Sequence, residues 1–151
     1  MERGILTYCS TISPSQCDGN GHLNVQHFAA IFDSAVGVFY ARCGMSWRWM
    51  GARSLGTVAA HQATTFLGEL CSGDAVECRT RLNRVGKTSL TFEHILVDAE
   101  TQRVAARLEA VSVLFGLETR TKVPIPDDIR ARLLRICEYE PDSESMKVVE
   151  P

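Results

Sequence analysis

The sequence lacks the features that mark several large classes of protein. It has no apolar run approaching the roughly 18–20 residues that a membrane-spanning helix needs. It has no excess of basic residues, because 16 Lys and Arg stand against 18 Asp and Glu, and this balance argues against nucleic-acid binding. Its first residues contain no apolar segment typical of a secretion signal. We therefore expect a cytoplasmic protein that binds neither membranes nor nucleic acids.

The chain also lacks the cysteine patterns that hold metals. Its six cysteines form no C-x-x-C pair and do not cluster with histidines, so we expect no metal site. An even number of cysteines would permit disulfide bonds. Without a secretion signal, free thiols in a reducing compartment are the expectation.

What the chain does contain suits one compact domain. Of its 151 residues, 45% are hydrophobic and 23% are charged, which is enough apolar material for a single core. No internal repeat or linker interrupts the sequence. We predict one domain over residues 1–140, followed by a polar, acidic tail over residues 141–151 that frays.

The hydrophobic pattern predicts one long helix among strands. Apolar residues recur at three- and four-residue steps over residues 25–43, with Asn24 suited to the N-cap and Gly44 to the end. A second helix is predicted after Pro126. Alternating residues predict strands over residues 5–12, 57–67, 74–85, 89–98 and 103–117. Short turns join the later strands, so an antiparallel sheet in an α+β domain is expected.

The densest polar cluster runs from Asp18 to Asn24, directly before the long helix. Its glycines allow a ligand to approach the backbone closely. The helix start offers unpaired N–H groups that can stabilise an oxyanion on an attacked carbonyl. Asp18 can act as a general base or as a nucleophile. A capped turn with a solvated Asp explains the same residues, so the spacing alone leaves both interpretations open.

The cluster forms part of a longer motif. The motif reads Asp18-x-x-Gly21-His22-x-Asn24, and the helix after it contains Phe32-Asp33-x-Ala35. In this setting the chain resembles the 4-hydroxybenzoyl-CoA thioesterase-like family, over about residues 5–126. The resemblance implies a hotdog fold, in which a curved antiparallel sheet of about five strands wraps a long central helix. It also implies hydrolysis of an acyl-CoA thioester, with no cofactor other than the coenzyme A that is part of the substrate.

The resemblance assigns roles within the motif. Asp18 takes the position of the family's catalytic aspartate, as a base or a nucleophile. The backbone N–H of Val25 and its neighbours at the helix start would polarise the thioester carbonyl. His22 and Asn24 would shape the loop. A structural residue bonded within the turn explains His22 equally well, and for Asn24 the helix cap is the favoured explanation.

Further residues are candidates for binding the substrate. Asp33 lies at the edge of the apolar helix face, and it replaces the Glu that is more common in the family. His61 and His94 lie on predicted strands and are candidates for an acyl pocket, although a His on an apolar face is more often a core residue. Arg84 and Lys87 flank a predicted hairpin, where they could attract the phosphates of coenzyme A, or could simply be solvated.

Two other activities and one other nucleophile remain open. A hotdog enoyl-CoA hydratase or dehydratase typically carries D-x-N-P-x-H. Here Gly21 replaces the proline and His22 comes one residue early, which counts against hydration. A non-catalytic acyl-CoA-binding module is the other alternative. Cys17 lies next to Asp18 and near His22 at the helix start, so a cysteine nucleophile is conceivable. The resemblance favours Asp18 instead, and the sequence provides no dedicated pair of base and orienting residue for Cys17.

The fold also predicts assembly. A single five-stranded sheet leaves an exposed edge, and pairing of two edges would cover it. Hotdog domains resemble one another in pairing in this way, with the sites at the interface. We expect a homodimer or a dimer of dimers.

Overall fold

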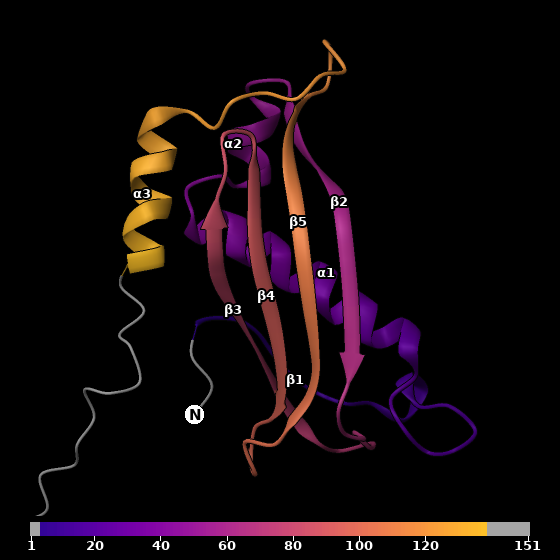
Figure 1. Ribbon diagram of the computed structural model, residues 1–151. Coiled ribbons are helices and arrows are strands. Elements are labelled where there is room, and N and C mark those ends of the chain that lie inside the picture. The colour runs from indigo at the N-terminus through magenta and orange to yellow at the C-terminus, as the bar shows by residue number, and fades with distance from the viewer. Residues whose placement is uncertain (1–3, 139–151) are drawn as a thin grey trace, which may run out of the picture.

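The computed structural model describes residues 4–138, which form one antiparallel sheet with helices on and beside it (Figure 1). The elements in chain order are β1 (Ile5–Thr11), a 3-10 turn (Pro14–Gln16), α1 (Val25–Arg42), α2 (Trp47–Gly51), β2 (Leu55–Phe66), β3 (Ala75–Val85), β4 (Ser89–Asp98), β5 (Val104–Gly116) and α3 (Asp127–Glu138). The strands are arranged in the order β1-β3-β4-β5-β2. The predicted tail over residues 141–151 lies outside the described residues.

The expected α+β architecture is confirmed. Each predicted strand is present, with ends within two residues of the prediction, and all neighbouring strands are antiparallel. The 18-residue helix α1 runs obliquely across one face of the sheet (Figure 1). Helix α2 was not predicted. Its five residues are too few to show a period, and its cap is a single bond from the backbone N–H of Trp49 to Ser46 Oγ.

Capping residues at both ends of helix α1 explain where it begins and ends. The side chain of Asn24 accepts a hydrogen bond from Gln26 N at 3.1 Å, as the predicted N-cap should. Beyond the last turn, Gly44 has φ +84°, a backbone conformation that side chains disfavour. Between these points, the aromatic and aliphatic face of the helix turns towards the sheet.

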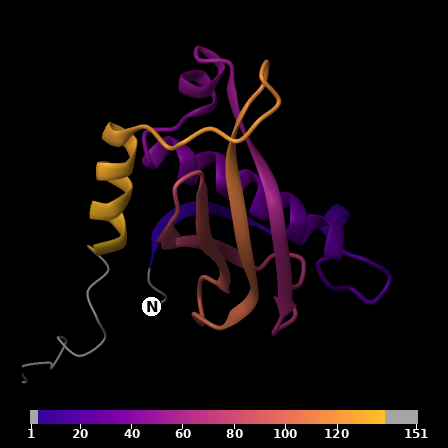
Figure 2. The same cartoon turned by 45° about the horizontal axis from the view of Figure 1, so that its top comes forward.

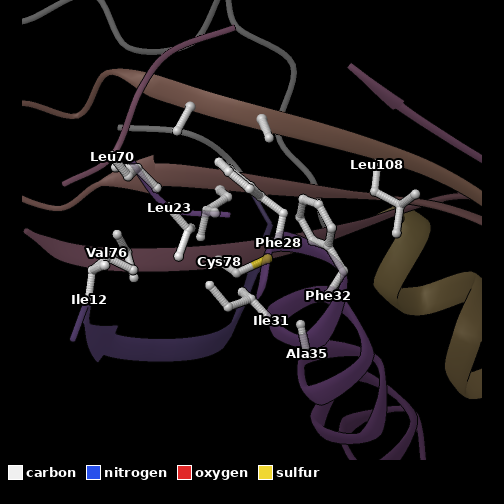
Figure 3. Packing of buried hydrophobic residues seen from close by; sticks show 13 residues of the cluster. Ile12, Leu23, Phe28, Ile31, Phe32, Ala35, Leu70, Val76, Cys78 and Leu108 are labelled. Carbon is white, nitrogen blue, oxygen red and sulfur yellow. The ribbon is translucent and has the colours of Figure 1, made fainter. Parts of the chain in front are cut away.

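The core lies between α1 and the sheet. Figure 3 shows Phe28, Ile31 and Phe32 projecting from α1 towards side chains of the strands, among them Cys78 and Leu108. A second cluster fills the other half of the interface, where Phe39 and Tyr40 meet Phe92 and where α3 adds Leu133. Helix α1 is thus held along its whole length, and its N-terminus has a fixed position.

The opposite face of the sheet is crossed by a buried ionic contact. Glu93 on β4 accepts hydrogen bonds from Arg81 on β3 at 2.9 Å and from Arg107 on β5 at 3.2 Å. Its carboxylate is therefore paired on both sides, which a buried charge requires. This pairing ties the three central strands together on the face that α1 leaves uncovered.

Strand β2 forms one edge of the sheet and differs from the others. It pairs with β5 alone, and most of its residues are exposed. This exposure explains why its hydrophobic alternation is blurred in the sequence. Figure 2 shows β2 at one edge of the sheet, beside α1. Within residues 4–138, no helix is both long and apolar enough to cross a membrane.

Candidate active site

The loop between Asp18 and Asn24 folds around the Asp18 carboxylate. Asp18 Oδ1 accepts hydrogen bonds from Asn20 N at 2.8 Å and from His22 N at 3.4 Å. The backbone closes the same loop, since Asp18 N donates to His22 O and Gly21 N donates to Asp18 O. Gly21 has φ +81°, which favours glycine at this position. Oδ1 is thus used by the loop, and Oδ2 has no hydrogen bond from any residue that the structure describes.

The start of α1 leaves one N–H group unused. Gln26 N donates to Asn24 Oδ1, and His27 N donates to Asn24 O at 2.9 Å. For Val25 N, no acceptor is present among residues 4–138. Val25 is also 62% exposed. The first N–H of the helix is therefore available to a ligand, at the end of α1 that carries partial positive charge.

Asp18 and Val25 line the same cavity, called here the first cavity, which has a volume of about 260 Å³. Its lining residues are Asp18, His22, Leu23, Val25, Phe28, Phe66, Gly68, Glu69 and Leu70. The motif and α1 form one wall, and the segment after β2 forms the other. Leu23 N donates to Leu70 O at 2.7 Å, which holds the two walls together.

A carboxylate oxygen and an unused N–H beside apolar side chains form a chemically competent pair. The oxygen can take a proton from water or attack a carbonyl carbon. The N–H can donate to the oxygen that becomes negative in the same step, and apolar walls strengthen that bond. The site therefore suits attack on an ester or thioester carbonyl.

His22 lies at the mouth of the first cavity. Its Nε2 is 3.4 Å from Glu69 Oε2; the His22 side chain is 37% exposed and that of Glu69 is 73% exposed. A pair of this kind contributes little to stability. The contact between His22 and Glu69 does link the motif to the opposite wall of the cavity. Glu69 belongs to no motif, so no pattern in the sequence indicated it.

A second cavity of about 260 Å³ lies further along α1, between that helix and the strands. Its lining residues are Ala29, Phe32, Asp33, Val36, Gln62, Thr64, Phe92, His94 and Leu108. It thus brings together two predicted substrate-binding residues, Asp33 and His94. Gln62 and Thr64 come from the exposed edge strand β2, whose blurred pattern gave no signal that would have identified them.

His94 is almost wholly enclosed, with 1% of its surface exposed. Its ring is stacked on Phe32, with centroids 5.8 Å apart, and its Nδ1 is 2.6 Å from Thr80 Oγ1. Burial lowers the pKa of His94 to about 4, because the protonated imidazole would lose its hydration. The side chain is therefore neutral at pH 7.

Other predicted residues lie outside both cavities. His61 is exposed on β2, and Arg84 and Lys87 are exposed at the turn between β3 and β4. In Figure 1 that turn lies at the opposite end of the sheet from the Asp18 loop. Within one chain these cations are therefore not brought to the first cavity, and their role in binding phosphate stays a prediction.

Two further expectations concern sulfur and metals. The thiol of Cys17 donates to Ser13 O at 3.8 Å, and Cys17 does not line the first cavity. This arrangement gives no support to a cysteine nucleophile. Over residues 4–138, no three His, Cys, Asp or Glu side chains gather as a metal would require, and no disulfide bond joins the cysteines.

Residues 12–133 match the model of the thioesterase-like superfamily. The betainyl-CoA thioesterase of Pseudomonas aeruginosa is 26% identical over 140 residues, which covers 91% of this chain and 87% of that protein.

Solved structures agree on the fold. The protein SAV2348 of Staphylococcus aureus, in complex with CoA, has a TM-score of 0.82 at 18% identity and covers all of both chains. The 1,4-dihydroxy-2-naphthoyl-CoA thioesterase Slr0204 of Synechocystis has a TM-score of 0.75 at 17% identity, covering 87% of this chain and 96% of that one. Together with the five-stranded antiparallel sheet, these likenesses confirm the α+β hotdog fold.

The low pKa of His94 makes stability depend on pH. The folded pKa, about 4, lies below the ordinary value of 6.5, so the unfolded chain binds this proton more readily. The contribution of neutral, buried His94 to the free energy of unfolding is complete above about pH 6.5 and is lost as pH falls towards 4. From pH 7 to pH 4, we expect this residue to remove about 3 kcal/mol from the free energy of unfolding.

Urea denaturation followed by circular dichroism measures this dependence. The free energy of unfolding of His94→Phe should fall less steeply with decreasing pH than that of the wild type, whatever the two values are at pH 7. His27→Phe, at a histidine that lines neither cavity, serves as the control. Parallel curves for wild type and His94→Phe would contradict the prediction.

Proposed function

Because the chain belongs to the thioesterase-like superfamily, and is thus a thioester hydrolase, we propose that it hydrolyses acyl-CoA thioesters to a free acid and coenzyme A. The observation that carries this proposal is the first cavity, where neither Asp18 Oδ2 nor the N–H of Val25 has a hydrogen-bond partner among residues 4–138. The name of the Pseudomonas relative and the CoA bound in the Staphylococcus structure support a CoA thioester as the substrate.

In the proposed reaction, Asp18 Oδ2 accepts a proton from a water molecule as that water attacks the thioester carbonyl carbon. The carbonyl oxygen becomes negative and accepts the hydrogen bond of Val25 N–H. The carbon–sulfur bond then breaks, and the proton held by Asp18 passes to the departing thiolate. If Asp18 attacks the carbon itself, the same N–H serves, and water afterwards hydrolyses the acyl–aspartyl anhydride.

The loop is built to keep this geometry. Oδ1 of Asp18 is held by two backbone N–H groups, so the carboxylate cannot turn freely. Asn24 uses its side chain to satisfy Gln26 N, which leaves Val25 N as the unused donor. We assign Asn24 and His22 to positioning, since neither is required to exchange a proton in the reaction.

We also propose that the chain works as a homodimer through β2. That strand is a 12-residue edge, and apolar side chains are exposed on or beside it: Val58 at 47%, Phe66 at 51% and Leu67 at 55%. Pairing of two such edges would satisfy their backbone groups and bury these side chains. Because β2 also lines both cavities, a second copy of the chain paired along β2 would close the sites. It would also bring its own basic side chains towards them.

The first prediction from the proposed function concerns Asp18. In Asp18→Asn, the amide oxygen can still accept the hydrogen bond of Asn20 N, so the loop keeps its shape while the base is lost. We expect kcat to fall by about 10²- to 10⁴-fold. Release of CoA from short, medium, long, aromatic and betainyl thioesters is the measurement, with a protein blank because the chain contributes six cysteine thiols.

Asp128→Asn, an exposed acid in the first turn of α3, is the matched control and should retain wild-type turnover. Unchanged turnover in Asp18→Asn would move the chemistry to another residue. Hydration of enoyl-CoA without CoA release would favour the hydratase alternative, and tight binding without turnover would favour a binding module.

The second prediction isolates the N–H of Val25. Proline is compatible with the first position of a helix, and Asn24 already has the extended conformation that precedes proline. Val25→Pro therefore removes the N–H and leaves the helix intact. We expect kcat to fall by about 10²- to 10³-fold, whereas Val25→Ala, which keeps the N–H, should lose far less. Equal effects of the two substitutions would show that the side chain matters and the N–H does not.

The third prediction concerns assembly. Val58→Lys places a charge on the exposed β2 edge, so we expect the sedimenting species to shift from dimer to monomer at micromolar concentration. Leu134→Lys, at a similarly exposed position on α3, should leave the dimer intact. A monomeric wild-type protein under these conditions would refute the interface.

A further inference from the structure

The second cavity lies further along α1 than the first. Val25 and Phe28 line the first, and the next turns of α1 provide Ala29, Phe32 and Asp33 to the second. Val25 and Phe32, whose ring is stacked on His94, are separated by about 10 Å along the helix axis. An extended acyl group of up to about eight carbons spans a comparable distance, so a thioester held in the first cavity can direct its acyl group towards the second.

One hydrogen-bonded chain behind this cavity fixes the proton position on His94. Thr7 Oγ1 donates to the carbonyl oxygen of Cys78 at 3.1 Å, because a carbonyl can only accept. The bond of 2.8 Å between Thr7 and Thr80 must then use the hydrogen of Thr80. With that hydrogen committed, Nδ1 of His94 has to donate in the 2.6 Å bond to Thr80. His94 is therefore the Nδ1–H tautomer, and Nε2 carries a lone pair.

That lone pair is available from the cavity. No residue among those described donates to His94 Nε2. The fully buried side-chain nitrogen and oxygen atoms that lack a partner in the described part of the chain are Arg79 Nε and Gln102 Oε1. Since Nε2 is not among them, it is not sealed in the core. His94 lines the second cavity, so a ligand in that cavity is the partner we consider for Nε2.

We propose that the second cavity receives the acyl group and that Nε2 of His94 accepts a hydrogen bond from an O–H or N–H donor on that group. This inference rests on the proposed thioesterase function and adds a substrate class to it: acyl groups of short length with a donor near their far end. Phe32 and Phe92 enclose the imidazole. A bound acyl group without a donor would leave the acceptor shielded from water and unpaired, which is costly.

The buried environment keeps this acceptor in its neutral form. Protonation at Nε2 would convert the acceptor into a donor and reverse the preference. Because burial lowers the pKa of His94 to about 4, protonation is rare near pH 7. Thr7 and Thr80 are themselves buried, so water does not compete for the bonds that fix the tautomer.

The test uses pairs of acyl-CoAs that differ only at the far end, a terminal CH₂–OH against the methyl isostere, such as 6-hydroxyhexanoyl-CoA and heptanoyl-CoA. Pairs of four to eight carbons sample different distances between the thioester carbon and the far end of the acyl group. For at least one length we expect kcat/KM to be about tenfold or more higher with the hydroxyl. In His94→Phe, which keeps the ring stacking, that ratio should fall to about one.

Thr80 provides the matched pair of variants. Thr80→Val removes the acceptor for Nδ1–H and releases the tautomer, so the hydroxyl preference should fall, whereas Thr80→Ser keeps the hydroxyl and should keep the preference. Long-range ¹H–¹⁵N spectra of the histidines report the tautomer directly. They should show Nδ1 protonated in wild type and in Thr80→Ser, and a mixture in Thr80→Val.

A binding measurement separates this inference from the proposed function. In Asp18→Asn, addition of the hydroxyacyl-CoA should shift the ¹⁵N resonance of His94 Nε2, and addition of the isostere should not. This result does not depend on turnover, so it holds even if no thioester is hydrolysed. Hydrolysis of both members of every pair at equal rates, an Nε2 that carries the proton, or a preference for acyl groups without any donor would each overturn the inference.

Discussion

The packing of α1 across the sheet is the interaction on which the site depends. Its aromatic and aliphatic residues meet the strands along the whole helix, so the first turn cannot shift relative to the segment after β2. The hydrogen bond between Leu23 and Leu70 then sets the distance between the two walls of the first cavity. A free N–H at a helix start is useful only if it is held in register with the group that attacks. Here the same core fixes both the start of α1 and the segment after β2.

Much of this arrangement could be predicted from the sequence because it is encoded locally. The three- and four-residue spacing of apolar residues defines α1, and the alternation of Val76, Cys78 and Leu82 defines the buried face of β3. The motif around Asp18 is likewise contiguous in the chain. Its position before a helix indicated both a carboxylate and an N–H donor. The structure adds which atoms of the loop remain unused, since that depends on hydrogen bonds between neighbouring residues.

Other parts of the site could not be read from the sequence. Gln62 and Thr64 lie on an edge strand that is exposed on both faces, so no alternation marks which side they take. Glu69 faces His22 across a contact between segments far apart in the chain. The charge of Arg84 and Lys87 suggested phosphate binding, but charge does not indicate how far these residues lie from the first cavity. Their hairpin packs against α3, where Arg130 donates to the carbonyl oxygens of Gly86 and Lys87.

The two cavities are lined by different kinds of chemical group. In the first, the groups that we propose to act on the carbonyl are a carboxylate in a turn and a backbone N–H, and neither distinguishes one acyl group from another. In the second, side chains from α1, β2 and β4 meet around His94, whose tautomer is set by Thr80 and ultimately by a backbone carbonyl. A substitution in this second set can change the acyl group accepted without altering the loop that carries the chemistry. The fold therefore lets substrate choice change while the reaction stays the same, because α1 joins the two cavities and contributes its N-terminus to one and its side chains to the other.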